Sequence, residues 1–181
     1  MTDMLVKLFE IGDGWQFIAE QKNQEITIRK PIGPEKHLIV KWVADNFGVA
    51  WAGETDVAFT NRPRTCFVAV KYETIVGFAC YDATALGFFG PVGVDRLHRR
   101  KGTGTALLKA CLLDMKLKGY GYAVVGAVKD IDFYKNTAGA IEIPGSTPGF
   151  YRTRVRKSQT YLPKGGTDDI DPNCRSRTGR R

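Results

Sequence analysis

The sequence predicts a single α/β domain in which helices flank a mixed, mostly antiparallel sheet with one splayed pair of parallel strands. Its 181 residues, 43% hydrophobic and 25% charged, suit one domain with one compact core. Two β-rich runs, 66–71 and 74–81, are separated by a short turn, which is typical of an antiparallel hairpin. A β-run at 86–94, a helix and a strand at 122–128 then imply a parallel crossover.

Before the hairpin, apolar spacing predicts a strand at 5–11, a short helix at 15–21 and a strand at 25–29. A longer helix is expected from Pro34, which suits a first turn, to the stop at Gly48. A second helix at 51–59 ends before the breaker at 61–64.

After the hairpin, the run at 86–94 contains three glycines and a proline, which an ordinary central strand does not tolerate. We therefore expect a bulge there, or a local separation from the neighbouring strand. The helix that follows has its apolar positions between 106 and 115 and ends at Gly119. The remaining elements are predicted in chain order as a strand at 122–128, a short helix at 130–137, a strand at 140–143 and a last strand at 150–156.

The cysteines predict neither a metal site nor a disulfide framework. No pair has the spacing of a zinc ligand set and no histidine cluster accompanies them, so reduced and mostly buried thiols are expected. The chain also lacks a secretory leader pattern and any apolar run of bilayer length, which predicts a cytoplasmic protein without a membrane partner. The four cysteines are Cys66, Cys80, Cys111 and Cys174.

The positive charge is concentrated at one end. Of the formal net charge of +8, residues 152–181 carry +6, from nine basic and three acidic residues. The body is close to neutral, which disfavours a broad nucleic-acid-binding face. From Ser158 the sequence is poor in apolar residues, so we expect a domain at 1–157 and a disordered basic tail at 158–181.

A basic, glycine-containing segment lies between the run at 86–94 and the following helix. Gly102 and Gly104 allow a close backbone approach, and unpaired amides at a helix start attract anions, so a diphosphate fits there. An ordinary solvated turn is the alternative. The segment has neither the order of a Walker-type P-loop nor the third glycine of a dinucleotide fingerprint.

Arg99-Arg100-Lys101-Gly102-Thr103-Gly104 resembles the phosphate loop of the GCN5-related N-acetyltransferases, Gln/Arg-x-x-Gly-x-Gly/Ala at a helix start. The resemblance extends over about residues 25–156, through the glycine-rich strand, the helix and the strand after it. It implies that acetyl-CoA lies between the splayed strands, near 92–94 and 124–127, with its pyrophosphate on the amides of 100–105. The implied cofactor-binding residues are Val92, Gly93, Val94, Arg99, Arg100, Lys101, Gly102, Thr103, Gly104 and Thr105.

The resemblance also implies a general acid. Tyr134 matches the tyrosine that protonates the departing thiolate, although Tyr134 to Ala140 has one residue more than the family pattern and lacks its final aromatic. No base stands out: Asp82, Glu54, Asp56 and a water chain remain open. His98 is a further candidate for phosphate contact, His37 is expected at the surface, and Cys80 lacks the histidine partner of a nucleophile.

The acceptor is expected at the helices between 34 and 59, where Trp42, Trp51, Glu54 and Asp56 suit a cationic amine. The resemblance thus implies acetyl transfer to a primary amine, preferably a small molecule, directly within a ternary complex. A non-catalytic acyl-CoA-binding module and a nucleic-acid-associated protein acting through residues 152–181 are the alternatives. The oligomeric state stays open, a homodimer included.

Overall fold

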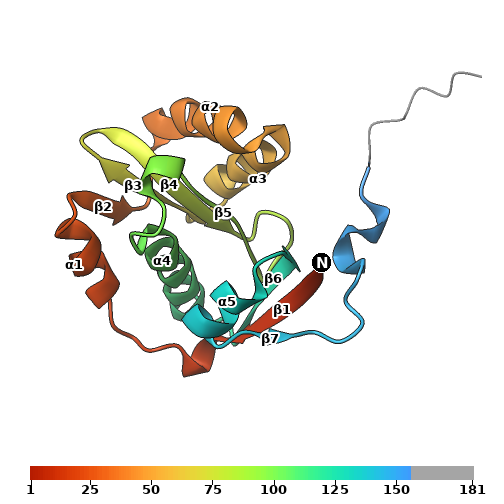
Figure 1. The fold of residues 1–181 in the computed structure, drawn as a ribbon. Coiled ribbons are helices and arrows are strands. Elements are labelled where there is room, and N and C mark those ends of the chain that lie inside the picture. Colours follow the sequence, from red (N-terminus) through yellow and green to blue (C-terminus); the bar gives the residue numbers. More distant parts are fainter. Residues whose placement is uncertain (156–181) are drawn as a thin grey trace, which may run out of the picture.

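The computed structural model describes residues 1–155, and its centre is a seven-stranded sheet (Figure 1). The strands lie in the order β2-β3-β4-β5-β6-β1-β7. Within the described residues, β5 and β6 are parallel and the other neighbours are antiparallel, which confirms the predicted sheet. The strands are β1 (Thr2–Lys7), β2 (Ile26–Arg29), β3 (Cys66–Lys71), β4 (Thr74–Tyr81), β5 (Phe88–Val94), β6 (Tyr122–Val128) and β7 (Ile141–Glu142).

Helices cover both faces of the sheet. One face carries α2 (Lys36–Phe47) and α3 (Val49–Thr60), and the other carries α1 (Gln16–Lys22), α4 (Thr103–Leu117) and α5 (Ile131–Ala138) (Figure 1). Four short 3-10 turns connect these elements: η1 (Leu8–Glu10), η2 (Gly33–Glu35), η3 (Arg96–His98) and η4 (Gly149–Thr153). Among the described residues, no helix is long and apolar enough to cross a membrane.

Two hydrophobic cores hold these layers together. On the α2–α3 face, Ile39 and Val43 lie one helical turn apart and are buried with Phe78 of β4. On the other face, α4 turns its apolar side to the sheet, and Leu107 and Leu112 are fully buried. Each such side chain contributes about 1.5–3 kcal/mol on burial, so α4 is firmly anchored.

The first strand differs from the expectation at 5–11. β1 spans Thr2–Lys7, and the chain turns into η1 where its pairing with β6 ends, at Lys7 opposite Tyr122. Leu8 is buried and its amide donates to the Gly121 carbonyl at 3.0 Å, whereas Phe9 is exposed. The predicted end was therefore wrong because the alternating pattern stops at Leu8.

The predicted last strand at 150–156 was wrong over the residues that the structure describes. Gly149–Thr153 form η4 instead. No ladder joins the described part of this segment to a strand, and its backbone closes a local turn in which the Arg154 amide donates to the Tyr151 carbonyl at 3.4 Å. The expected tail at 158–181 lies outside the described residues.

Candidate active site

Strands β5 and β6 separate soon after they meet. Their parallel pairing is confined to Phe88 with Val124 and Phe89 with Val125. Further along β5, residues 92–94 pair with β4, but no ladder joins them to β6. A register shift between β4 and β5 accompanies the divergence. The separation predicted from the glycine-rich run is thus present. We call the space between the separated strands the crevice; the unpaired backbone groups along its edges can hydrogen-bond to a molecule that carries its own amides.

A buried acid fixes the shape of β6 at the separation. The β1–β6 register shifts between Thr2 and Met4, so the chain of β6 bulges opposite Asp3. The Ala127 amide donates to Asp3 Oδ1 at 2.8 Å, Ala127 has a φ of 52°, and Asp3 is 7% exposed. Sequence reasoning missed Asp3, although an acid in an apolar strand was a usable signal.

The loop from β5 into α4 forms an anion cradle. Gly102 caps α4 with a φ of 77°, and the Ala106 amide donates to its carbonyl at 2.9 Å. The amides of residues 103–105 precede this first helical bond, so no helical carbonyl accepts from them. A Cβ placed on Gly104 would meet only Val94 Cγ2, at 3.7 Å, which leaves the approach to these amides open. Such a helix start attracts negative charge.

Gln21 of α1 clamps this loop. Its Nε2 donates to the Lys101 carbonyl at 3.0 Å, and its Oε1 accepts from the Thr103 hydroxyl at 2.8 Å. Gln21 is 2% exposed and Thr103 is 1% exposed. The Thr103 side chain is therefore committed to the clamp. No sequence signal linked Gln21 to a loop 80 residues away.

The basic side chains of the loop divide into two groups. Arg99 Nε donates to the Val94 carbonyl at 3.0 Å and Lys101 Nζ to the Leu97 carbonyl at 3.2 Å, so both fold back on the loop. Arg100 is exposed and its backbone has a φ of 60°. His98 Nδ1 lies 3.1 Å from Asp95 Oδ1, and this contact lowers the pKa of Asp95. His98 is thus engaged with an acid beside the cradle.

Tyr134 lies on the face of the sheet that α4 and α5 cover. The centroid of its ring lies 6.2 Å from that of Phe89 and 5.0 Å from that of Phe133, both in edge-to-face geometry. Phe89 is the last β5 residue that is paired with β6. Burial, and then the negative charge of Asp130, raise the pKa of Tyr134 to about 12. The phenol is therefore protonated at neutral pH and can donate a proton next to the separation.

Two of the carboxylates considered as general bases already have hydrogen-bond or ion-pair partners. Asp82 Oδ1 accepts from the Gly87 amide at 2.7 Å and its Oδ2 from the Tyr120 hydroxyl at 2.9 Å, so Asp82 shapes the β4–β5 loop. Asp56 pairs with Lys36 at 2.9 Å. Glu54 differs, because its partner is the Thr84 hydroxyl.

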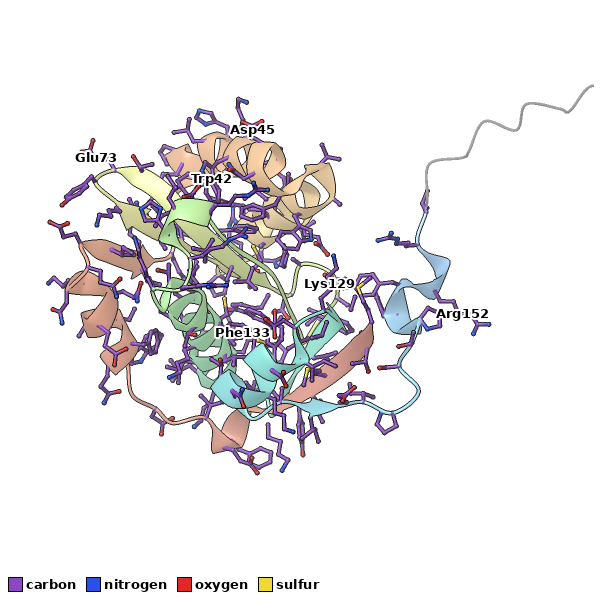
Figure 2. All side chains as sticks on the ribbon, in the orientation of Figure 1. Trp42, Asp45, Glu73, Lys129, Phe133 and Arg152 are labelled. Atoms are coloured by element: carbon purple, nitrogen blue, oxygen red, sulfur yellow. The ribbon has the colours of Figure 1, made fainter. Side chains whose placement is uncertain are left out.

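The structure also places the other residues that the sequence analysis considered for a functional role. Burial raises the pKa of the Cys80 thiol, which is fully buried and therefore unreactive. His37 is exposed, as expected. Trp42 points from α2 toward the sheet (Figure 2), where its ring lies 5.6 Å from that of Phe47. Trp51 stacks on the same Phe47 at 5.5 Å.

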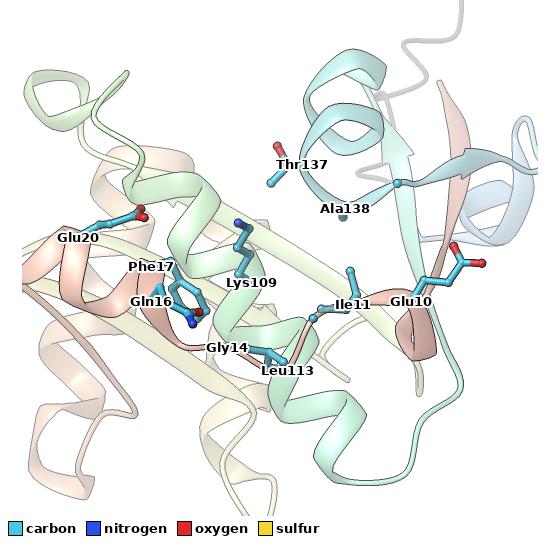
Figure 3. Close-up of a pocket in the computed structure, with 12 residues that line it drawn as sticks. Glu10, Ile11, Gly14, Gln16, Phe17, Glu20, Lys109, Leu113, Thr137 and Ala138 are labelled. Atoms are coloured by element: carbon cyan, nitrogen blue, oxygen red, sulfur yellow. The ribbon is translucent and has the colours of Figure 1, made fainter.

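A separate hollow of about 460 Å³ lies between the β1–α1 segment, α4 and the end of α5 (Figure 3). Phe17 and Leu113 supply apolar surface, and Lys109 and Thr137 are among its polar lining residues. Neither Tyr134 nor any residue of 99–105 lines it. The crevice and cradle, not this hollow, unite the residues selected from the sequence.

The separated strands and the anion cradle define a class of protein that binds an anionic donor with an extended, amide-bearing arm. The sequence profile of the acetyltransferase (GNAT) family matches residues 36–139, more than half of the chain. The chain belongs to this family, whose acyl donor is acetyl-CoA. No curated protein matches the chain.

Solved structures are similar in fold. The glucosamine N-acetyltransferase region of a fungal multi-domain GH3 beta-N-acetylglucosaminidase has a TM-score of 0.64 at 14% identity, over 78% of this chain and 19% of that one. A GCN5-related N-acetyltransferase from Sphaerobacter thermophilus has a TM-score of 0.60 at 20% identity, over 78% of this chain and 48% of that one. A GCN5-related N-acetyltransferase from Kribbella flavida has a TM-score of 0.55 at 19% identity, over 78% of this chain and 53% of that one. The chain thus spans at most about half of these proteins.

Proposed function

We propose that the protein is an acetyl-CoA-dependent N-acetyltransferase that acetylates a primary amine of a small molecule directly, within a ternary complex. The observation that carries this proposal is the separation of β5 from β6 between the cradle at α4 and the protonated Tyr134. The buried, reduced thiols Cys66, Cys80 and Cys111 support the expectation that it works in the cytoplasm.

The residues fit acetyl-CoA in two places, at its pyrophosphate and along its pantetheine arm. The free amides of 103–105 and the exposed Arg100 suit the pyrophosphate, and the open space at Gly104 lets it approach. The unpaired edge of 92–94 suits the amides of the pantetheine arm. Bound there, acetyl-CoA supplies an activated acetyl thioester.

In the reaction, the neutral amine nitrogen attacks the thioester carbonyl, a C–N bond forms and the C–S bond breaks. Backbone N–H groups of Val92, Gly93 or Val94 that face the crevice would stabilise the negative oxygen of the intermediate. Tyr134 would donate a proton to the thiolate of CoA, and the proton lost from the amine returns to the phenolate through solvent. The products are an N-acetylated amine and free CoA.

Calorimetric titration with acetyl-CoA tests the cofactor site. Gly104→Glu puts negative charge where the pyrophosphate belongs, while its Cβ meets only Val94 at 3.7 Å and an acid is favourable at a helix start. The variant should therefore fold and lose binding. Gly121→Glu, at a turn where a Cβ meets nothing within 4 Å, is the matched control and should bind as the unchanged protein does.

Release of free CoA in the presence of an amine panel then tests the chemistry. Turnover with at least one primary amine is expected. Binding of acetyl-CoA without transfer to any amine would instead identify a non-catalytic acyl-CoA-binding module.

A further inference from the structure

Aromatic side chains also lie beside the crevice on the second side of the sheet, opposite the face that carries Tyr134. Tyr134 and Phe89 belong to the α4–α5 face, whereas Gly93 of β5 and Gly126 of β6 face the opposite way. A Cβ on Gly93 would lie 2.7 Å from Phe47 Cζ, and one on Gly126 would lie 2.8 Å from the Tyr151 hydroxyl. Each separating strand therefore has an aromatic side chain lying directly against its backbone on this second side.

A polar chain crosses this side from α3 to η4. The Thr84 hydroxyl donates to Glu54 Oε1, and an interaction with Thr84 opposes the rise in the pKa of Tyr151. Tyr151 lies against Gly126, the first β6 residue beyond the paired section. The Glu54 carboxylate is thus linked by contacts to the point where the strands separate.

The Glu54 carboxylate has no cationic partner among the described side chains. Within residues 1–155, the recorded partner of Glu54 is a hydroxyl, whereas Asp56 on the same helix is neutralised by Lys36. Burial raises the pKa of Tyr151, and the negative charges of Glu54 and Asp3 raise it further, against the opposing charge of Arg154. A carboxylate without a cationic partner favours a cation beside it.

Exposed aromatic rings lie on α3 and in η4. Trp51, one helical turn before Glu54, is 37% exposed and stacks on Phe47 at 5.5 Å. Phe150 is 56% exposed, and its ring lies 5.1 Å from that of Phe88. Such exposed rings are suited to a flat apolar group.

We infer that the acceptor is a monocationic arylalkylamine whose ammonium group binds Glu54 and then releases one proton to solvent to give the neutral nucleophile, and whose aromatic body lies against Trp51 and Phe150. This inference rests on the proposed function and specifies its substrate class. We call this second side the acceptor face; its residues are Trp51, Glu54, Thr84, Phe88, Phe150 and Tyr151.

The test compares amines at saturating acetyl-CoA by release of free CoA. The probes are phenethylamine, butylamine with the same charge and no ring, glucosamine, and a peptide with one lysine. Phenethylamine should have a kcat/KM at least about ten-fold above each of the others, since burial of a ring is worth that much. A higher kcat/KM for butylamine or glucosamine overturns the inference and leaves the proposed function standing. A higher kcat/KM for the peptide overturns the inference and the small-molecule acceptor of the proposed function as well.

Two variants test the acceptor face itself. Glu54→Gln keeps an acceptor for Thr84 but removes the charge, so the KM for phenethylamine should rise about ten-fold while the Kd for acetyl-CoA is unchanged. Asp56→Asn, a matched loss of charge on the same helix, should leave that KM within about two-fold. Equal effects of the two variants overturn the role of Glu54. Absence of transfer to every amine, with acetyl-CoA still bound, overturns the proposed function and this inference with it.

Discussion

At the scale of single residues, the ionisation of Tyr134 sets the expected pH dependence. Burial and Asp130 raise its pKa to about 12, so the phenol keeps its proton from neutral pH to well above pH 9. A general acid is active in its protonated form, and Tyr134 therefore contributes no fall in kcat over that range. Tyr134→Phe should lower kcat about 100-fold without changing the Kd for acetyl-CoA.

The control for that variant is Tyr122→Phe, because Tyr122 is 53% exposed and lies at the start of β6. Steady-state kinetics from pH 7 to pH 9 measure both variants. Equal kcat values for the two would remove Tyr134 from the reaction. An alkaline fall in wild-type kcat that Tyr134→Phe abolishes would instead contradict the raised pKa of Tyr134.

Gln21 gives a second prediction at this scale. Gln21→Met fills a similar volume but leaves the Lys101 carbonyl and the Thr103 hydroxyl without their buried partner. We expect a loss of about 1–3 kcal/mol in the free energy of unfolding, together with weaker acetyl-CoA binding because the cradle loses its clamp. Gln24→Met is the control, since the exposed Gln24 also donates to the Lys101 carbonyl, at 3.2 Å. If chemical denaturation and calorimetry do not separate the two variants, the clamp has no effect on the cradle.

At the scale of elements, the bulge in β6 depends on an acid of β1. Asp3→Ala leaves the Ala127 amide without its acceptor, so β6 is expected to straighten toward β5 and the KM for acetyl-CoA to rise. Asp3→Asn still offers a carbonyl oxygen to that amide and should retain most of the activity. The same KM for both variants, or an unchanged KM in Asp3→Ala, would show that the crevice does not need this contact.

The elements also show what the sequence can predict. The glycines and proline of 86–94 cannot satisfy a regular ladder, so a separation was predictable from local chemistry, and so was the cradle at Gly102 and Gly104. The partner of a strand is a non-local property. Residues 150–156 were predicted as a strand, yet no ladder joins the described part of this segment to the sheet, and residues 149–153 form a 3-10 turn.

The same limit applies to the candidate site. Loop amides and Tyr134 belong to a contiguous pattern that sequence reasoning can find. Gln21, Asp3 and Tyr151 reach the crevice across tens of residues, through contacts that only the fold creates. The functional side chains that were missed are therefore those that position other groups.

At the scale of the whole molecule, the N-terminal strand occupies the interior of the sheet beside the crevice. β1 lies between β6 and β7 in Figure 1, with Met4 and Val6 fully buried. The chain before η4 passes over this strand: the Asp3 amide donates to Ser146 Oγ at 2.8 Å, and the Thr147 hydroxyl donates to the Met1 carbonyl at 2.7 Å. Arg152 then points outward, away from the crevice (Figure 2). Both ends of the described chain thus contribute to one wall of the site.

This arrangement predicts unequal effects of shortening the two ends. Removal of residues 1–7 takes away Met4 and Val6, worth about 1.5–3 kcal/mol each, and exposes the edges of β6 and β7. Because a domain is stable by only about 5–15 kcal/mol, we expect this variant to be largely unfolded. A chain ending at Lys157 retains η4 and should keep both its melting temperature and its affinity for acetyl-CoA. Circular dichroism melts and calorimetry compare the two, and a folded, acetyl-CoA-binding protein without residues 1–7 would show that β1 is not needed to form the crevice.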